Sequence, residues 1–143
     1  MWPPPREWLE GGAEGVHAIQ PDVLAIWISE ELWRVELEGA APIAPGVLAA
    51  PRGRLVSRVD EWTDEAARDF ARACAAHVRA VPPGWAAEYA EDAAADAQRA
   101  RADSTATLVG YTAARAVEAA EPGSLAAERR RQSLWLAQRL GLI

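Results

Sequence analysis

The sequence predicts a mainly α protein, with an N-terminal β-hairpin and a short helix packed on an Ala-rich bundle of three or four helices. Three observations lead to this fold class. The second half of the chain is rich in Ala, Arg and acidic residues, with prolines only at positions 82, 83 and 122. Apolar positions in that half recur with the 3.6-residue period of an amphipathic helix. In the first half, short alternations of apolar and polar residues are typical of strands.

A single domain is expected, because 143 residues suit one compact core and leave little room for two. Residues 1–61 would form its hairpin-containing N-terminal part, and residues 62–143 its helical bundle. Half of the residues are apolar and a quarter are charged, which is the composition of a globular protein rather than of a disordered chain.

The N-terminal part is expected to contain one hairpin and one short helix. Residues 33–38 and 54–59 alternate apolar and polar side chains, and residues 46–50 are a candidate beginning of the second strand. Residues 39–46 hold two prolines and two glycines and would connect the strands. Residues 23–28 form an apolar run that suits either a buried strand or a short helix. Asp22 as an N-cap favours the helix.

Four helices are expected in the second half, at residues 63–80, 85–102, 105–120 and 124–140. Thr63 and Ser124 are suitable N-caps for the first and the last of them, and Asp103 or Ser104 for the third. No proline prevents a continuous helix from 85 to 120, but the caps favour a break or kink at 103–105.

Each helix should turn an apolar stripe toward the core. The stripe of the first helix includes Phe70 and Cys74, both expected to be buried. The second helix has a face of alanines, which lets a neighbouring helix approach closely. The third helix should bury Leu108, Val109, Thr112, Ala116 and Ala120. The fourth should align Leu125, Gln132, Leu136 and Leu140.

Cys74 and His77 lie one helical turn apart, a spacing that can hold a metal ion. The chain has no second cysteine, and its other histidine, His17, lies in a Gly-rich segment. Buried structural roles are therefore favoured over metal ligation. We expect an unreactive thiol at Cys74, no metal ligand and no cofactor.

Two charged clusters are interpreted as solvated or internally paired surfaces. Glu88, Asp92 and Asp96 recur four residues apart, but no Glu-x-x-His sequence completes a carboxylate metal site of the kind found in helical bundles. If this face does act, it suits a basic protein better than a metal ion. The arginines at 129–131 cannot form a one-sided phosphate-binding stripe, because successive helical residues point about 100° apart.

The sequence disfavours several classes of protein. The net charge of −6 disfavours a nucleic-acid binder. The apolar runs are far shorter than the roughly 18 residues of a membrane span, and the first residues lack the apolar region of a secretion signal. The single cysteine suits a reducing compartment, so a cytoplasmic location is expected. No nucleophile elbow, phosphate loop or dinucleotide-binding motif is present, so no catalytic residue is assigned.

Two stretches carry a resemblance to known proteins: TLVGYTAARAVEAA at 107–120 and ERRRQSLWLAQRL at 128–140. Together with the rest of residues 62–143, they resemble an Ala-rich helical family of immunity proteins from bacterial toxin systems. The resemblance implies a small cytoplasmic protein that binds another protein and performs no chemistry. It transfers no site residues.

The leading hypothesis is therefore a non-catalytic protein-binding module whose acidic charge favours a basic partner, with an immunity protein as its specific form. The candidate binding residues are Glu88, Glu91, Asp92, Trp27 and Trp33. A small tailoring enzyme or small-molecule carrier is the alternative, with a pocket between hairpin and bundle lined by Trp and Tyr. A homo-oligomeric structural protein is a third hypothesis.

Overall fold

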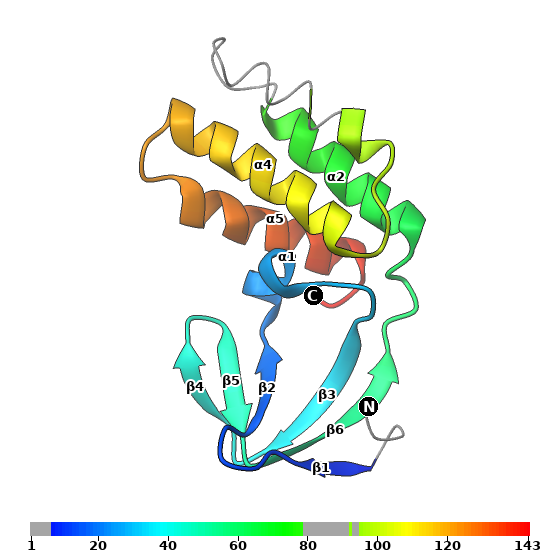
Figure 1. Ribbon diagram of the computed structural model, residues 1–143, viewed down its shortest axis with the longest axis vertical. Helices are drawn as coiled ribbons and strands as arrows, with labels where there is room; N and C mark the ends of the chain where they lie inside the picture. Colours follow the sequence, from blue (N-terminus) through cyan, green and yellow to red (C-terminus); the bar gives the residue numbers. More distant parts are fainter. Residues whose placement is uncertain (1–6, 79–91, 93–94) are drawn as a thin grey trace.

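A computed structural model of the chain describes residues 7–78, 92 and 95–143. The helices lie at one end of the molecule and two small β-sheets at the other (Figure 1). Each sheet has three antiparallel strands, in the orders β1-β6-β3 and β2-β5-β4. The fold is therefore α+β, and the prediction of a mainly α protein is wrong.

The strands are short and frequently interrupted. They are β1 (Trp8–Glu10), β2 (Val16–Ile19), β3 (Trp33–Glu38), β4 (Ala41–Ala44), β5 (Val47–Ala50) and β6 (Arg52–Arg58). Only Pro51 separates β5 from β6, so the chain passes there directly from one sheet to the other. Strands of three or four residues are too short to establish an alternating pattern, which is why β1, β2 and β4 were missed.

The predicted hairpin is only partly right. β3 pairs with β6 in antiparallel fashion, as expected. Residues 41–44, however, are a strand and not a connection, and residues 47–50 belong to the other sheet. Gly46 makes the tight turn between β4 and β5 with a φ of +73°. A Cβ atom at Gly46 would approach Val23 to 2.6 Å, so helix packing also requires glycine there.

The helices agree more closely with the sequence. They are η1 (Pro21–Val23), α1 (Leu24–Trp27), α2 (Asp64–Val78), α4 (Ser104–Ala120) and α5 (Leu125–Arg139). The choice of a helix over a strand at 23–28 is confirmed, and so is the break at 103–105. Half of the helix expected at 85–102 lies outside the described residues; residues 95–97 are helical and a turn follows them.

Two of the expected helix caps form, and one is replaced. The side chains of Thr63 and Asp103 accept backbone N–H bonds at the starts of α2 and α4. The buried hydroxyl of Ser124 has no hydrogen-bond partner among the described residues. Instead, the carboxylate of Glu118 accepts bonds from the amides on both sides of Ser124, at 2.9 and 2.7 Å. These bonds hold the pKa of Glu118 below its ordinary value.

The hydrophobic core lies mainly among the helices. Phe70 is fully buried and its ring centroid lies 6.2 Å from that of Trp135, which confirms its predicted core position. Many of its neighbours are alanines, which let α2 and α4 pack closely. Val59 and Trp62 continue this core from the end of β6 toward the helices. Leu108, expected to be buried, is instead 62% exposed.

Candidate functional site

The C-terminal helix α5 buries an unusual number of polar side chains. Glu128, Arg129, Gln132 and Ser133 are all buried, although charged residues rarely are unless they are paired. Of the three consecutive arginines, Arg129 is buried, Arg131 is partly buried and Arg130 is exposed. The prediction of internal pairing for this run is confirmed, because Arg131 forms an ion pair with Glu128.

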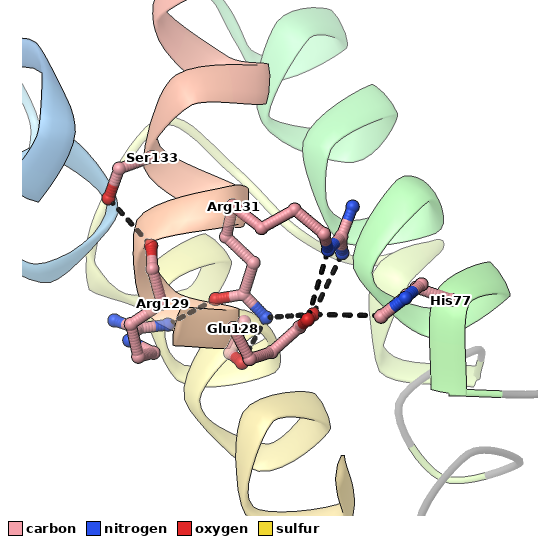
Figure 2. Close-up of polar contacts among 7 residues, drawn as sticks. His77, Glu128, Arg129, Arg131 and Ser133 are labelled. Carbon is pink, nitrogen blue, oxygen red and sulfur yellow. Dashed lines mark hydrogen bonds and ion pairs between the residues drawn. The ribbon is translucent and has the colours of Figure 1, made fainter. Parts of the chain in front are cut away.

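Glu128 is the centre of the first half of this network. Its carboxylate accepts two bonds from the guanidinium of Arg131, at 2.8 and 3.0 Å, and lies 3.0 Å from Nδ1 of His77 on α2 (Figure 2). Gln132 links the network to α4 by donating a 2.9 Å bond to the carbonyl of Gly110. The carboxylate therefore joins α5 to α2, and its glutamine neighbour joins α5 to α4.

The second half of the network holds α1 in place. Arg129 donates a 2.8 Å bond to the carbonyl oxygen of Ala25, and the hydroxyl of Ser133 accepts a 3.0 Å bond from the amide of the same residue. That hydroxyl also donates to the carbonyl of Arg129 (Figure 2). A helix of four residues has no stability of its own in water. The two contacts to Ala25 fix it through its backbone.

Because α1 is held through its backbone, two of its large side chains can stay exposed to solvent. Ile26 and Trp27 are exposed, with 59% of the Trp27 surface accessible. Leu108 and Tyr111, one turn apart on α4, are exposed as well. We call these four residues the α1–α4 apolar surface.

Three contacts place the two halves of this surface beside each other. Helices α1 and α4 pack together, as Figure 1 also shows. The hydroxyl of Thr107 on α4 donates a 3.2 Å bond to the carbonyl of Ile28, which ends α1. The guanidinium of Arg129, bonded to Ala25, lies 5.9 Å from the centre of the Tyr111 ring. These contacts thus hold the α1 and α4 parts of the surface next to each other.

The structure separates the predicted binding residues. Trp27 lies on the α1–α4 apolar surface. Trp33 is half-buried on β3, where its indole N–H donates a 3.1 Å bond to Glu31. Asp92 is exposed, and Glu88 and Glu91 lie outside the described residues. On α4, sequence reasoning assigned Leu108 to the buried stripe and so missed its part in this surface, whereas the helical period places Tyr111 on the outer face.

A cleft of about 520 Å³ lies between β2 and β3. Its walls are mostly apolar and include Trp33, but none of the described residues that line it is a tyrosine. This is the feature closest to the pocket expected for the alternative hypothesis. The described lining residues include no cysteine and present no nucleophile with an adjacent base.

The spacing of Cys74 and His77 serves the core and its polar network. Cys74 is buried among the helices, and the imidazole of His77 turns toward Glu128. Within the described parts of the chain, no three His, Cys, Asp or Glu residues are grouped so that they could hold a metal ion.

We expect Cys74 to react very slowly with thiol reagents in the native protein. Burial raises the pKa of its thiol to about 12, and the reactive species is the thiolate. Labelling with a chromogenic disulfide at mildly alkaline pH should be at least about a hundredfold slower than in urea. Fast labelling without denaturant would show that the helical core opens readily at α2.

Comparisons of the chain with models of protein families, with curated proteins and with solved structures find no match. Among the described residues, none of the helices has the length and apolar character needed to cross a membrane.

Proposed function

We propose that this protein is a non-catalytic binding module that recognises another protein through its α1–α4 apolar surface. The observation that carries the proposal is the exposure of Ile26, Trp27, Leu108 and Tyr111 on neighbouring helices, of which α1 is held through its backbone at Ala25. Single exposed apolar residues are ordinary, but a group of large ones on one rigid base is typical of an interaction surface.

The residue types at this surface suit the centre of a protein interface. Tryptophan and tyrosine are enriched among the residues that contribute most to binding, because they bury large areas and lose little conformational freedom. The two hydrogen bonds that Arg129 and Ser133 make to the backbone of Ala25 add to this advantage. Since α1 is already ordered, a partner does not have to supply the free energy of ordering it.

The partner is expected to carry basic groups around an apolar centre. The chain has a net charge of −6, and exposed Glu30 and Glu31 lie a few residues after the end of α1. Acidic residues at Glu88, Glu91 and Asp92 would add to the attraction during encounter. An immunity protein that neutralises a toxin in the cytoplasm fits this description, in line with the resemblance of residues 62–143.

Replacing Trp27 or Tyr111 with alanine should weaken binding to the partner about thirtyfold or more, as for a central interface residue. The partner would be isolated by cross-linking and pull-down from the native cells, and its affinity measured by calorimetry. Val56→Ala is the matched control, because Val56 is a similarly exposed apolar residue on β6. Its affinity should be unchanged.

Two results would contradict this function. Equal affinities of the Trp27→Ala, Tyr111→Ala and control variants would remove the α1–α4 apolar surface from the interface. Concentration-dependent self-association of the chain that is lost in Trp27→Ala would make a second copy the partner, as the oligomer hypothesis holds. Analytical ultracentrifugation measures this directly.

A further inference from the structure

The cleft of about 520 Å³ is bordered by the edges of two strands, each the outermost strand of its sheet among the described residues. β2 is the outer strand of one sheet and β3 is the outer strand of the other. Figure 1 shows them on either side of the same space, below α1. In the described part of the chain, neither edge pairs with another strand. Unpaired edges of this kind readily accept a further strand.

The way the residues line the cleft shows that backbone faces it. Three consecutive residues of each strand contribute to the lining, 17–19 from β2 and 33–35 from β3. Successive side chains of a strand point to opposite faces of the sheet. Three in a row that border one cavity indicate that the cavity runs along the edge of the strand, where the backbone groups are.

The hydrogen-bond register identifies which backbone groups point into the cleft. The amide of Gln20 donates to the carbonyl of Gly46, just before β5. Because backbone groups alternate in direction along a strand, the N–H and C=O groups of Ile19 and His17 point away from β5. The carbonyl of Leu32 accepts from Val59 after β6. By the same alternation, the N–H and C=O groups of Trp33 and Val35 point away from β6.

The rest of the lining defines what kind of segment fits. Ile19, Leu55 and Val59 give it apolar walls, with the start of α1 above. Three side chains could carry charge: His17, Glu31 and Arg34. The carboxylate of Glu31 pairs with Arg58 and accepts a hydrogen bond from the Trp33 indole, and the imidazole of His17 contacts the carbonyl of Glu14. Arg34 has no ion-pair partner among the described residues, so the charge still to be matched is positive.

We propose that this cleft binds an extended, mainly apolar peptide segment bearing one carboxylate, which adds as a strand between β2 and β3. Its backbone would bond to the edge groups of His17, Ile19, Trp33 and Val35, and its carboxylate would pair with Arg34. The added strand would join the two sheets into one. This site is separate from the α1–α4 apolar surface and does not depend on the function proposed for it.

The first test is selection of displayed random heptapeptides on the full chain. Sequences that alternate apolar residues and contain one Asp or Glu should be enriched. A chosen peptide, labelled with fluorescein, is then compared with a copy N-methylated at alternate residues. The copy keeps its side chains but cannot donate to one strand edge, and its affinity should fall at least about tenfold. Fluorescence anisotropy measures both dissociation constants.

Amide hydrogen exchange gives a readout that side-chain contacts alone would not change. Binding of the unmodified peptide should slow exchange at Ile19 and Val35 at least about tenfold, because their amides become hydrogen-bonded. The exposed amide of Glu14, outside the cleft lining, is the internal control.

Variants of the chain complete the experiment. Arg34→Gln should weaken peptide binding several-fold and reduce its dependence on salt. Trp27→Ala should leave peptide binding unchanged, so failure of this site and failure of the α1–α4 apolar surface are distinguishable. The proposal is overturned if no extended sequence is enriched, or if the N-methylated copy binds equally well. It is also overturned if the selected peptide leaves exchange at Ile19 and Val35 unaltered.

Discussion

Replacing Glu128 with alanine is expected to lower the free energy of unfolding by about 3 kcal/mol. The carboxylate is 4% exposed and balances the charge of Arg131, which is itself 38% exposed. Its loss also leaves His77 without its partner and Gln132 with one contact fewer. The effect is at the lower end for a broken buried ion pair because Arg131 can turn toward water. Urea unfolding followed by circular dichroism measures it.

Two variants control for the charge and the shape of Glu128. Glu121→Ala removes an equal charge from the exposed loop before α5 and should change stability by no more than about 0.5 kcal/mol. Glu128→Gln keeps the shape and one acceptor, so its loss should lie between those of the other two. If Glu128→Ala were as stable as Glu121→Ala, the polar network would not hold the helices together.

Replacing Phe70 with alanine should cost about 3 to 5 kcal/mol. Phe70 is the only phenylalanine of the chain, is fully buried, and packs between Trp135 and the backbone of Gly110. The surrounding alanines have short side chains that cannot extend into the space left behind. The cavity therefore stays open, which adds to the lost burial.

Phe70→Leu is the matched variant, since it keeps most of the buried volume and should lose much less stability. Denaturant unfolding of both variants gives the difference. A loss below about 1 kcal/mol in Phe70→Ala would indicate that the core closes around the missing ring. Such a result would contradict the rigid packing of α2 against α4 and α5.

The helical half could be predicted from sequence because its signals are local. Thr63 and Asp103 are caps within a few residues of the helices that they start, and Phe70 and Cys74 lie on a stripe that the helical period itself defines. The N-terminal half could not be predicted to the same degree. Its strands are short, and their partners lie far away along the chain: β1 pairs with β6, and β2 with β5.

The candidate surface combines both kinds of information. The chain has seven tryptophans among 143 residues, and Trp27 is a predicted binding residue because tryptophan is enriched at protein interfaces. The helical period already places Tyr111 away from the core, but the exposure of Leu108 could be found only from the structure. It depends on how α4 is rotated against α2 and on where α1 crosses it.

The sequence by itself determined, to within a residue, where α2, α4 and α5 begin, and that Phe70 and Cys74 lie on the buried face of α2. It also determined that the arginine run is internally paired or exposed, since Arg131 pairs with Glu128 and Arg130 faces solvent. These features depend on neighbours within about one helical turn. Only the tertiary structure decided that α5 turns polar groups inward, that Ala25 is clamped by Arg129 and Ser133, and that two strand edges border one cleft. Each of these depends on contacts between residues more than ten positions apart, and no local pattern encodes them.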